Sequence, residues 1–245
     1  MSLATMPGMK SAKATKEHRA RRTSRDGHPD PWTVQLIGGT MDPKLLRSIR
    51  AATRDHDPTA PWPTHAPRLL PMIRRSRQPF SPDFVPLTID VPPGIPVGFG
   101  IDIGPAMHVV DTSFADRWGV DHATLLATSL TNLQRLVRTE PPVIQRFTDE
   151  LAGDVVSIGG QGWGSALLLL PDVLQTILGS QPRVLLAPVR NHVVALTMDA
   201  TLDVCSTMWA ALVDGAHDEL DVPLYFWEGG QVLRDLGAPQ GEIIH

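Results

Sequence analysis

The stretch from residue 97 to residue 137 constrains the fold most, because a strand pattern, a turn and a helix pattern follow one another within it. Apolar residues alternate with glycine or aspartate over residues 97–103, which is the period of two expected for a strand with one buried face. Gly104 and Pro105 then indicate a turn, and residues 106–110 indicate a second strand that pairs back antiparallel.

A helix is expected to follow this hairpin, with Asp121 as its N-cap and Pro141 and Pro142 beyond its end. The order of two strands and one helix then recurs twice. We predict strands at 154–158, 165–170, 183–187, 192–198 and 224–227, helices that begin near Pro171 and Thr201, and a helical or irregular segment at 143–152. This order predicts an α+β fold with a mixed, mainly antiparallel sheet and helices packed on it.

Charge divides the chain into two parts. Residues 1–78 hold 15 Lys and Arg against 6 Asp and Glu, whereas residues 79–245 hold 7 against 20. Such a division suits a basic arm for an anionic partner, a basic arm that folds back on its own acidic domain, or two solvated surfaces. The sequence leaves these three interpretations open.

Three regions follow from composition. Residues 1–31 are basic and nearly free of large apolar side chains, so we expect a disordered tail. Binding of nucleic acid through this tail is the weaker interpretation, because no aromatic residue is interleaved for stacking on bases. Residues 32–96 should form a short strand, a helix capped by Asp42 and a Pro-rich extended strap, since 11 prolines lie between residues 58 and 96. Residues 97–245 should form the α+β domain.

Several classes of protein are disfavoured. The single cysteine, Cys205, excludes an intramolecular disulfide and a cysteine-based zinc site, and its helical spacing from Trp209 predicts an inert core thiol. No apolar run is long enough to cross a bilayer, and the first residues lack the apolar core of a secretory signal. We therefore expect a cytoplasmic protein that uses no cofactor, no metal and no membrane.

Asp102 and His108 are the catalytic candidates. A turn of three residues would place them opposite one another for acid–base chemistry, whereas a turn of two residues would send them to opposite faces. The glycine-rich link GGQGWG at 159–164 does not match the spacing of a phosphate-binding loop, so a flexible connection is the preferred interpretation.

Arg190, Asn191 and His192 are the binding candidates. They lie at the tip of the predicted hairpin, where a guanidinium, an amide and an imidazole together suit a carboxylate or a phosphate. Turn chemistry alone also explains Asn191.

Several segments resemble the bacterial YtpQ-like family of unknown function (DUF1444). The matching pieces are Ala127 with Asn132 and Leu133, the segment SALLLLP at 165–171, and the turn PVRN at 188–191, in that order within about residues 97–230. His192 departs from the family pattern, which has an acidic residue there. The resemblance implies a fold and no activity.

These observations lead to one expectation of function and one alternative. The charge division and the lack of a complete catalytic motif favour a non-enzymatic interaction or regulatory module with a protein partner. The alternative is a hydrolase or small-molecule-binding protein with a cleft near Asp102, His108 and Arg190.

Overall fold

The computed structural model describes residues 42–74, 84–213, 220 and 224–234, all within one unit, Gly38–His245. The tail at 1–31 and the strand expected at 32–37 lie outside these residues. The described helical segments are α1 (Pro43–Asp55), α2 (Trp62–His65), η1 (Ala66–Arg68), α3 (Thr112–Trp118), α4 (His122–Thr139), η2 (Gly164–Leu169), α5 (Pro171–Leu178) and α6 (Leu202–Val213).

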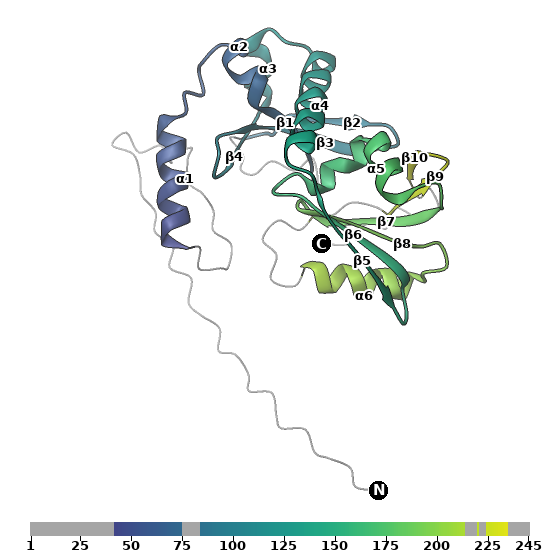
Figure 1. Ribbon diagram of the computed structural model, residues 1–245. Coiled ribbons are helices and arrows are strands. Elements are labelled where there is room, and N and C mark those ends of the chain that lie inside the picture. Colours follow the sequence, from purple (N-terminus) through teal and green to yellow (C-terminus); the bar gives the residue numbers. More distant parts are fainter. Residues whose placement is uncertain (1–41, 75–83, 214–219, 221–223, 235–245) are drawn as a thin grey trace, which may run out of the picture. The chain divides into compact units, whose positions relative to one another are not determined.

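The strands form two sheets, and every ladder among the described residues is antiparallel, so the predicted α+β class is confirmed (Figure 1). The first sheet contains β1 (Leu69–Ile73), β2 (Thr88–Val91), β3 (Ile95–Asp102) and β4 (Met107–Val109). The second contains β5 (Val143–Asp149), β6 (Gly153–Gly159), β7 (Arg183–Val189), β8 (His192–Thr197), β9 (Tyr225–Glu228) and β10 (Gln231–Arg234).

Helix ends follow the sequence signals. Asp42 and Asp121 cap α1 and α4, since each carboxylate accepts a hydrogen bond from a backbone N–H of the first turn, that of Lys44 at 2.9 Å and that of Thr124 at 2.7 Å. Gly179 follows α5 with a φ of 71°, a conformation that favours glycine and ends the helix.

The first sheet begins earlier than the sequence suggested. Its strand order is β1-β3-β2, with β4 also paired to β3, and β1 is buried throughout. The Pro-rich stretch, expected to be an extended strap without regular structure, therefore supplies both β1 and β2. Pro71 is tolerated inside β1 because β3 is the one described strand that pairs with it, and an edge strand can lack one N–H donor.

The second sheet has the order β10-β9-β7-β8-β6-β5 and is covered on two faces. On one face, α6 packs through Cys205 against side chains that include Val155, Val184 and Val194. The other face joins η2, α5 and the first sheet in a larger core, and Figure 1 shows α5 and α6 on opposite sides of this sheet.

Three local predictions were wrong. Residues 143–149, expected to be helical or irregular, are strand β5, and residues 165–170, expected to be a strand, are mostly the buried 3₁₀ helix η2. The strand predicted to close the chain, β9, is followed by another strand, β10. The hairpin of β7 and β8 and the helix α6 are confirmed.

Candidate functional site

Asp102 and His108 lie on opposite faces of the β3–β4 hairpin. Asp102 pairs with Met107, and His108 pairs with Ile101, so successive positions of the pleat carry the two side chains away from each other. This is the arrangement that a two-residue turn produces. The Asp102 carboxylate accepts a hydrogen bond from the Gly104 N–H at 2.7 Å, which stabilises that turn.

His108 joins a histidine cluster made of His56, His65 and His108. The ring centroid of His56 lies 4.9 Å from that of His108 and 5.2 Å from that of His65. These three residues come from the end of α1, from α2 and from β4. Phe114 and Trp118 of α3 pack beside them, with centroids 5.3 Å from His108 and His65 respectively.

Burial favours the neutral form of the histidine cluster. It lowers the pKa of His108 to about 4, and His56 nearby adds to the decrease. Burial likewise lowers the pKa of His56 and of His65. The positive charge of Arg68 lowers both pKa values further, whereas the negative charge of Asp57 raises them. The cluster is thus a group of imidazole rings packed beside Phe114 and Trp118.

Arg190 turns toward the first sheet and away from the hairpin tip. Its Nη1 atom lies 4.0 Å from the sulfur of Met72 on β1. Arg74 is only 4% exposed and lies on the same side of β1 as Met72. Its side chain passes over Gly98, where a Cβ atom would collide with it. Burial first, and the charge of Arg190 second, lower the pKa of Arg74 to about 10.

Asn191 holds the glycine-rich link in place. Its Oδ1 accepts a hydrogen bond from the Gly162 N–H at 2.9 Å, and its backbone carbonyl accepts one from the Gly160 N–H at 2.8 Å. A side chain at Gly164 would overlap the Asn191 carbonyl. The link expected to be flexible is therefore fixed to the β7–β8 turn, and the amide expected to bind a ligand is engaged within the protein.

A hollow of about 620 Å³, which we call the Trp163 hollow, opens beside this link. Asn191 and His192 line it, so two of the three predicted binding residues share one cavity. Val143, the first residue of β5, also lines it. The remaining lining residues are Glu140, Pro141, Gly159, Gly160, Gln161 and Trp163.

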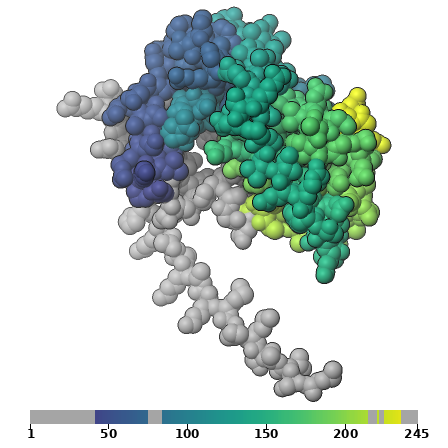
Figure 2. Space-filling view, in the orientation of Figure 1, coloured from purple at the N-terminus to yellow at the C-terminus, as the bar shows by residue number. Residues whose placement is uncertain are grey.

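Strand β5 is the most exposed apolar segment of the second sheet. It forms one edge of the sheet and, among the described strands, pairs only with β6. Val143, Ile144 and Phe147 are 66%, 43% and 47% exposed. Since neighbouring residues of a strand point to opposite faces, apolar side chains are exposed on both faces of β5. In Figure 2, the teal-green segment that follows α4 and contains β5 lies at the front of the molecule, with no other part of the chain over it in this view.

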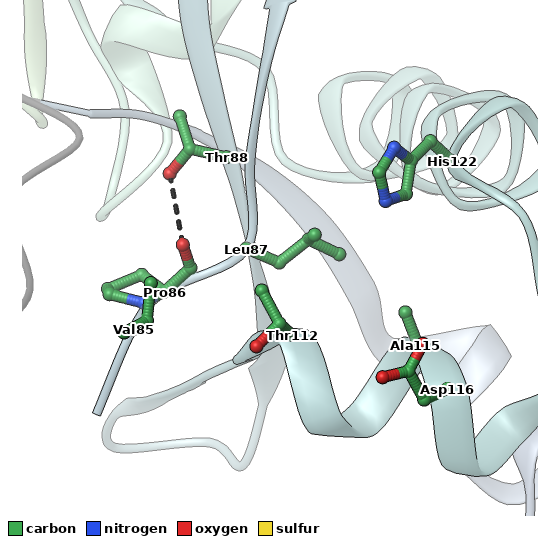
Figure 3. Close-up of a pocket in the computed structure, with 8 residues that line it drawn as sticks. All are labelled: Val85, Pro86, Leu87, Thr88, Thr112, Ala115, Asp116 and His122. Carbon is green, nitrogen blue, oxygen red and sulfur yellow. Dashed lines mark hydrogen bonds between the residues drawn. The ribbon is translucent and has the colours of Figure 1, made fainter. Parts of the chain in front are cut away.

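A second hollow, of about 470 Å³, lies between the segment that leads into β2 and the starts of α3 and α4. Figure 3 shows Asp116 on α3 and His122 on α4. The side chain of Leu87 extends toward these helices from the segment that leads into β2. The hydrogen bond drawn there joins the Thr88 hydroxyl to the Pro86 carbonyl at 3.4 Å. One carboxylate and one imidazole do not make a catalytic constellation.

Comparisons with known proteins give no match to a family model, to a curated protein or to a solved structure. The resemblance to the YtpQ-like family stays a prediction. Among the described residues, no group of three or more His, Cys, Asp or Glu side chains is arranged to hold a metal ion. No described helix has both the length and the apolar character needed to cross a membrane.

Sequence reasoning missed the β5 edge altogether. Val143, Ile144 and Phe147 lie in a segment without alternation, because both faces of an uncovered edge strand carry apolar and polar residues side by side. The available signal was the cluster of β-branched and aromatic residues directly after Pro141 and Pro142.

Proposed function

We propose that this chain is a non-enzymatic interaction protein and that its binding surface is the β5 edge, Val143–Asp149. The observation that carries the proposal is the exposure of apolar side chains on both faces of a seven-residue edge strand. An unprotected edge of this kind offers a row of backbone N–H and C=O groups to another strand. The single buried cysteine fits a reducing, cytoplasmic setting for this activity.

The middle of β5, between Pro142 and Asp149, has little edge protection, which supports the proposal. Proteins usually protect edge strands with charged side chains, prolines or bulges. The charged side chain in the middle of β5, that of Arg146, instead donates a hydrogen bond inward to the Ile177 carbonyl. Apolar surface that is left uncovered beside an open edge is typical of a binding site.

The catalytic alternative receives less support. A hydrolase would need Asp102, His108 and Arg190 to converge on one cleft. The register of β3 and β4 sends the first two to opposite faces, and Arg190 is directed to Met72.

Site-specific photocrosslinking tests the proposal. A photoreactive amino acid replaces Gln145 in the middle of β5 or, as a control, the 71% exposed Leu202 on α6. We expect a protein adduct of defined mass from position 145 that disappears when Val143→Lys and Phe147→Lys are added. Equal adducts from both positions, or none from position 145, would refute an interaction at the β5 edge.

A further inference from the structure

We propose that the partner at the β5 edge is a second copy of this chain, paired antiparallel through β5 about a two-fold axis at Gln145. This inference rests on the proposed function and names its partner. The two six-stranded sheets would then join into one continuous sheet across the dimer. Homodimers with two-fold symmetry use the same surface patch on both copies, so the patch must be complementary to itself.

The side chains of β5 meet this requirement in one register. With Gln145 opposite itself, Val143 lies opposite Phe147 of the second copy, and this pair occurs twice. A β-branched residue opposite an aromatic one is a stabilising cross-strand pair. On the other face, Ile144 lies opposite the aliphatic part of Arg146, and no two like charges meet.

The neighbouring registers are worse. An axis at Arg146 would place two guanidinium groups opposite one another and would set Val143 against Asp149, and like charges in directly opposed positions are destabilising. An axis at Ile144 would oppose only Val143, Ile144 and Gln145 within the two strands, and it would set Phe147 against Pro141, outside β5. The pattern of β5 therefore selects the axis at Gln145.

The Trp163 hollow provides a place for the exposed aromatic ring. Val143 lines this hollow. Val143, Phe147 and Gly159 belong to one face of the sheet, because Val143 pairs with Gly159 and residues two apart share a face. In the Gln145 register, Phe147 of the second copy lies opposite Val143 and so at the edge of the hollow. Each ring that is 47% exposed in the single chain would gain apolar contacts there.

Sedimentation of the full chain over a range of concentrations is the first test. We expect a monomer–dimer equilibrium that the double variant Val143→Lys/Phe147→Lys weakens by at least about tenfold, since each lysine would then oppose a lysine of the other copy. Leu202→Lys, an equally polar change on α6, should leave the equilibrium unchanged. Thermal melting monitored by circular dichroism checks that all variants fold.

Disulfide trapping tests the register. Directly opposed residues have Cβ atoms about 5 Å apart, close enough for a bond after mild oxidation. Gln145→Cys should therefore trap a covalent dimer. Thr148→Cys should not, because the two copies of position 148 would lie roughly 20 Å apart. Cys205 is buried and is not expected to react.

Each outcome has a distinct meaning. A chain that stays monomeric at every concentration overturns the dimer, and faster trapping by Arg146→Cys than by Gln145→Cys overturns the register. If the chain is monomeric but the photocrosslink at position 145 captures a different protein, the dimer is refuted while the β5 edge remains a binding surface. If the chain is monomeric and no adduct forms, both proposals fail.

Discussion

Asn132 is the residue whose replacement should most sharply test the packing of α4 on the first sheet. It is 7% exposed, and its Nδ2 group donates to the carbonyls of Ala66 at 2.7 Å and Leu69 at 2.9 Å. These two carbonyls mark the entry into β1. The amide thus fixes the start of the strand that the Pro-rich stretch contributes to the core.

The cost of losing this amide can be estimated from the two hydrogen bonds that its Nδ2 group donates; its Oδ1 also accepts one from Arg135 Nη2 at 3.1 Å. A buried acceptor left without a donor costs about 1–3 kcal/mol. The Leu69 carbonyl is fully buried and the Ala66 carbonyl only partly. Asn132→Leu should therefore lower the free energy of unfolding by about 2–4 kcal/mol. Asn132→Asp should also lower the free energy of unfolding at neutral pH, because a carboxylate cannot donate to the two carbonyl oxygens and keeps only the hydrogen bond that Arg135 Nη2 donates at 3.1 Å.

Urea unfolding followed by tryptophan fluorescence measures both variants. Burial among carbonyls favours the protonated form of the introduced carboxyl group, whereas the Arg135 guanidinium favours the carboxylate. The Asn132→Asp defect should shrink once the pH is low enough to protonate this group, because the protonated group regains a donor. Thr131→Ala, an exposed change on the same helix, should shift stability by less than about 0.5 kcal/mol. Equal stability of Asn132→Asp and Thr131→Ala at neutral pH would refute the role given to the amide.

Two further predictions concern the histidine cluster and the glycine-rich link. In the folded chain the pKa values of His56, His65 and His108 are lowered from 6.5, that of His108 to about 4. As pH falls, these groups therefore take up protons in the unfolded chain first. The free energy of unfolding should accordingly fall as pH drops from 6.5 toward 4. Urea titrations at several pH values should show a shallower fall in His108→Gln; an unchanged slope would contradict the burial of this ring. Gly164→Ala should destabilise the chain by more than about 2 kcal/mol, because its Cβ would overlap the Asn191 backbone. Gln161→Ala in the same link should be nearly neutral in the same assay, and equal stability of the two variants would contradict this packing.

Local signals predicted much of the fold. Asp42, Asp121 and Gly179 act within one turn of their own helices, so their roles can be inferred from neighbouring residues alone. The hairpin of β7 and β8 was likewise predictable from two apolar runs around a short turn.

The errors arose where distant parts of the chain decide the local structure. The apolar run at 165–170 suits a buried strand as well as a buried helix, and only its packing between the sheets makes it η2. Pro71 argued against a strand, yet β1 forms because the edge of the first sheet tolerates proline.

The candidate site was predictable only in part. A place at the hairpin tip predicts Asn191 and His192 as binding residues, and both line the Trp163 hollow. That Asn191 would bind Gly162, 29 residues away, depends on tertiary contacts that no local pattern contains. The β5 edge escaped prediction because exposure on both faces removes the alternation by which strands are recognised.

Amide hydrogen exchange of the full chain at low and high concentration tests whether β5 is the binding edge. The outward N–H groups of β5 should gain protection as the concentration rises, whereas those of β10, the opposite edge of the same sheet, should not. The double variant Val143→Lys/Phe147→Lys should lose the effect. Two results would contradict the assignment of the β5 edge as the binding surface. One is exchange from β5 that stays equally fast at every concentration and also after addition of any protein captured at position 145. The other is protection that appears at β10 instead.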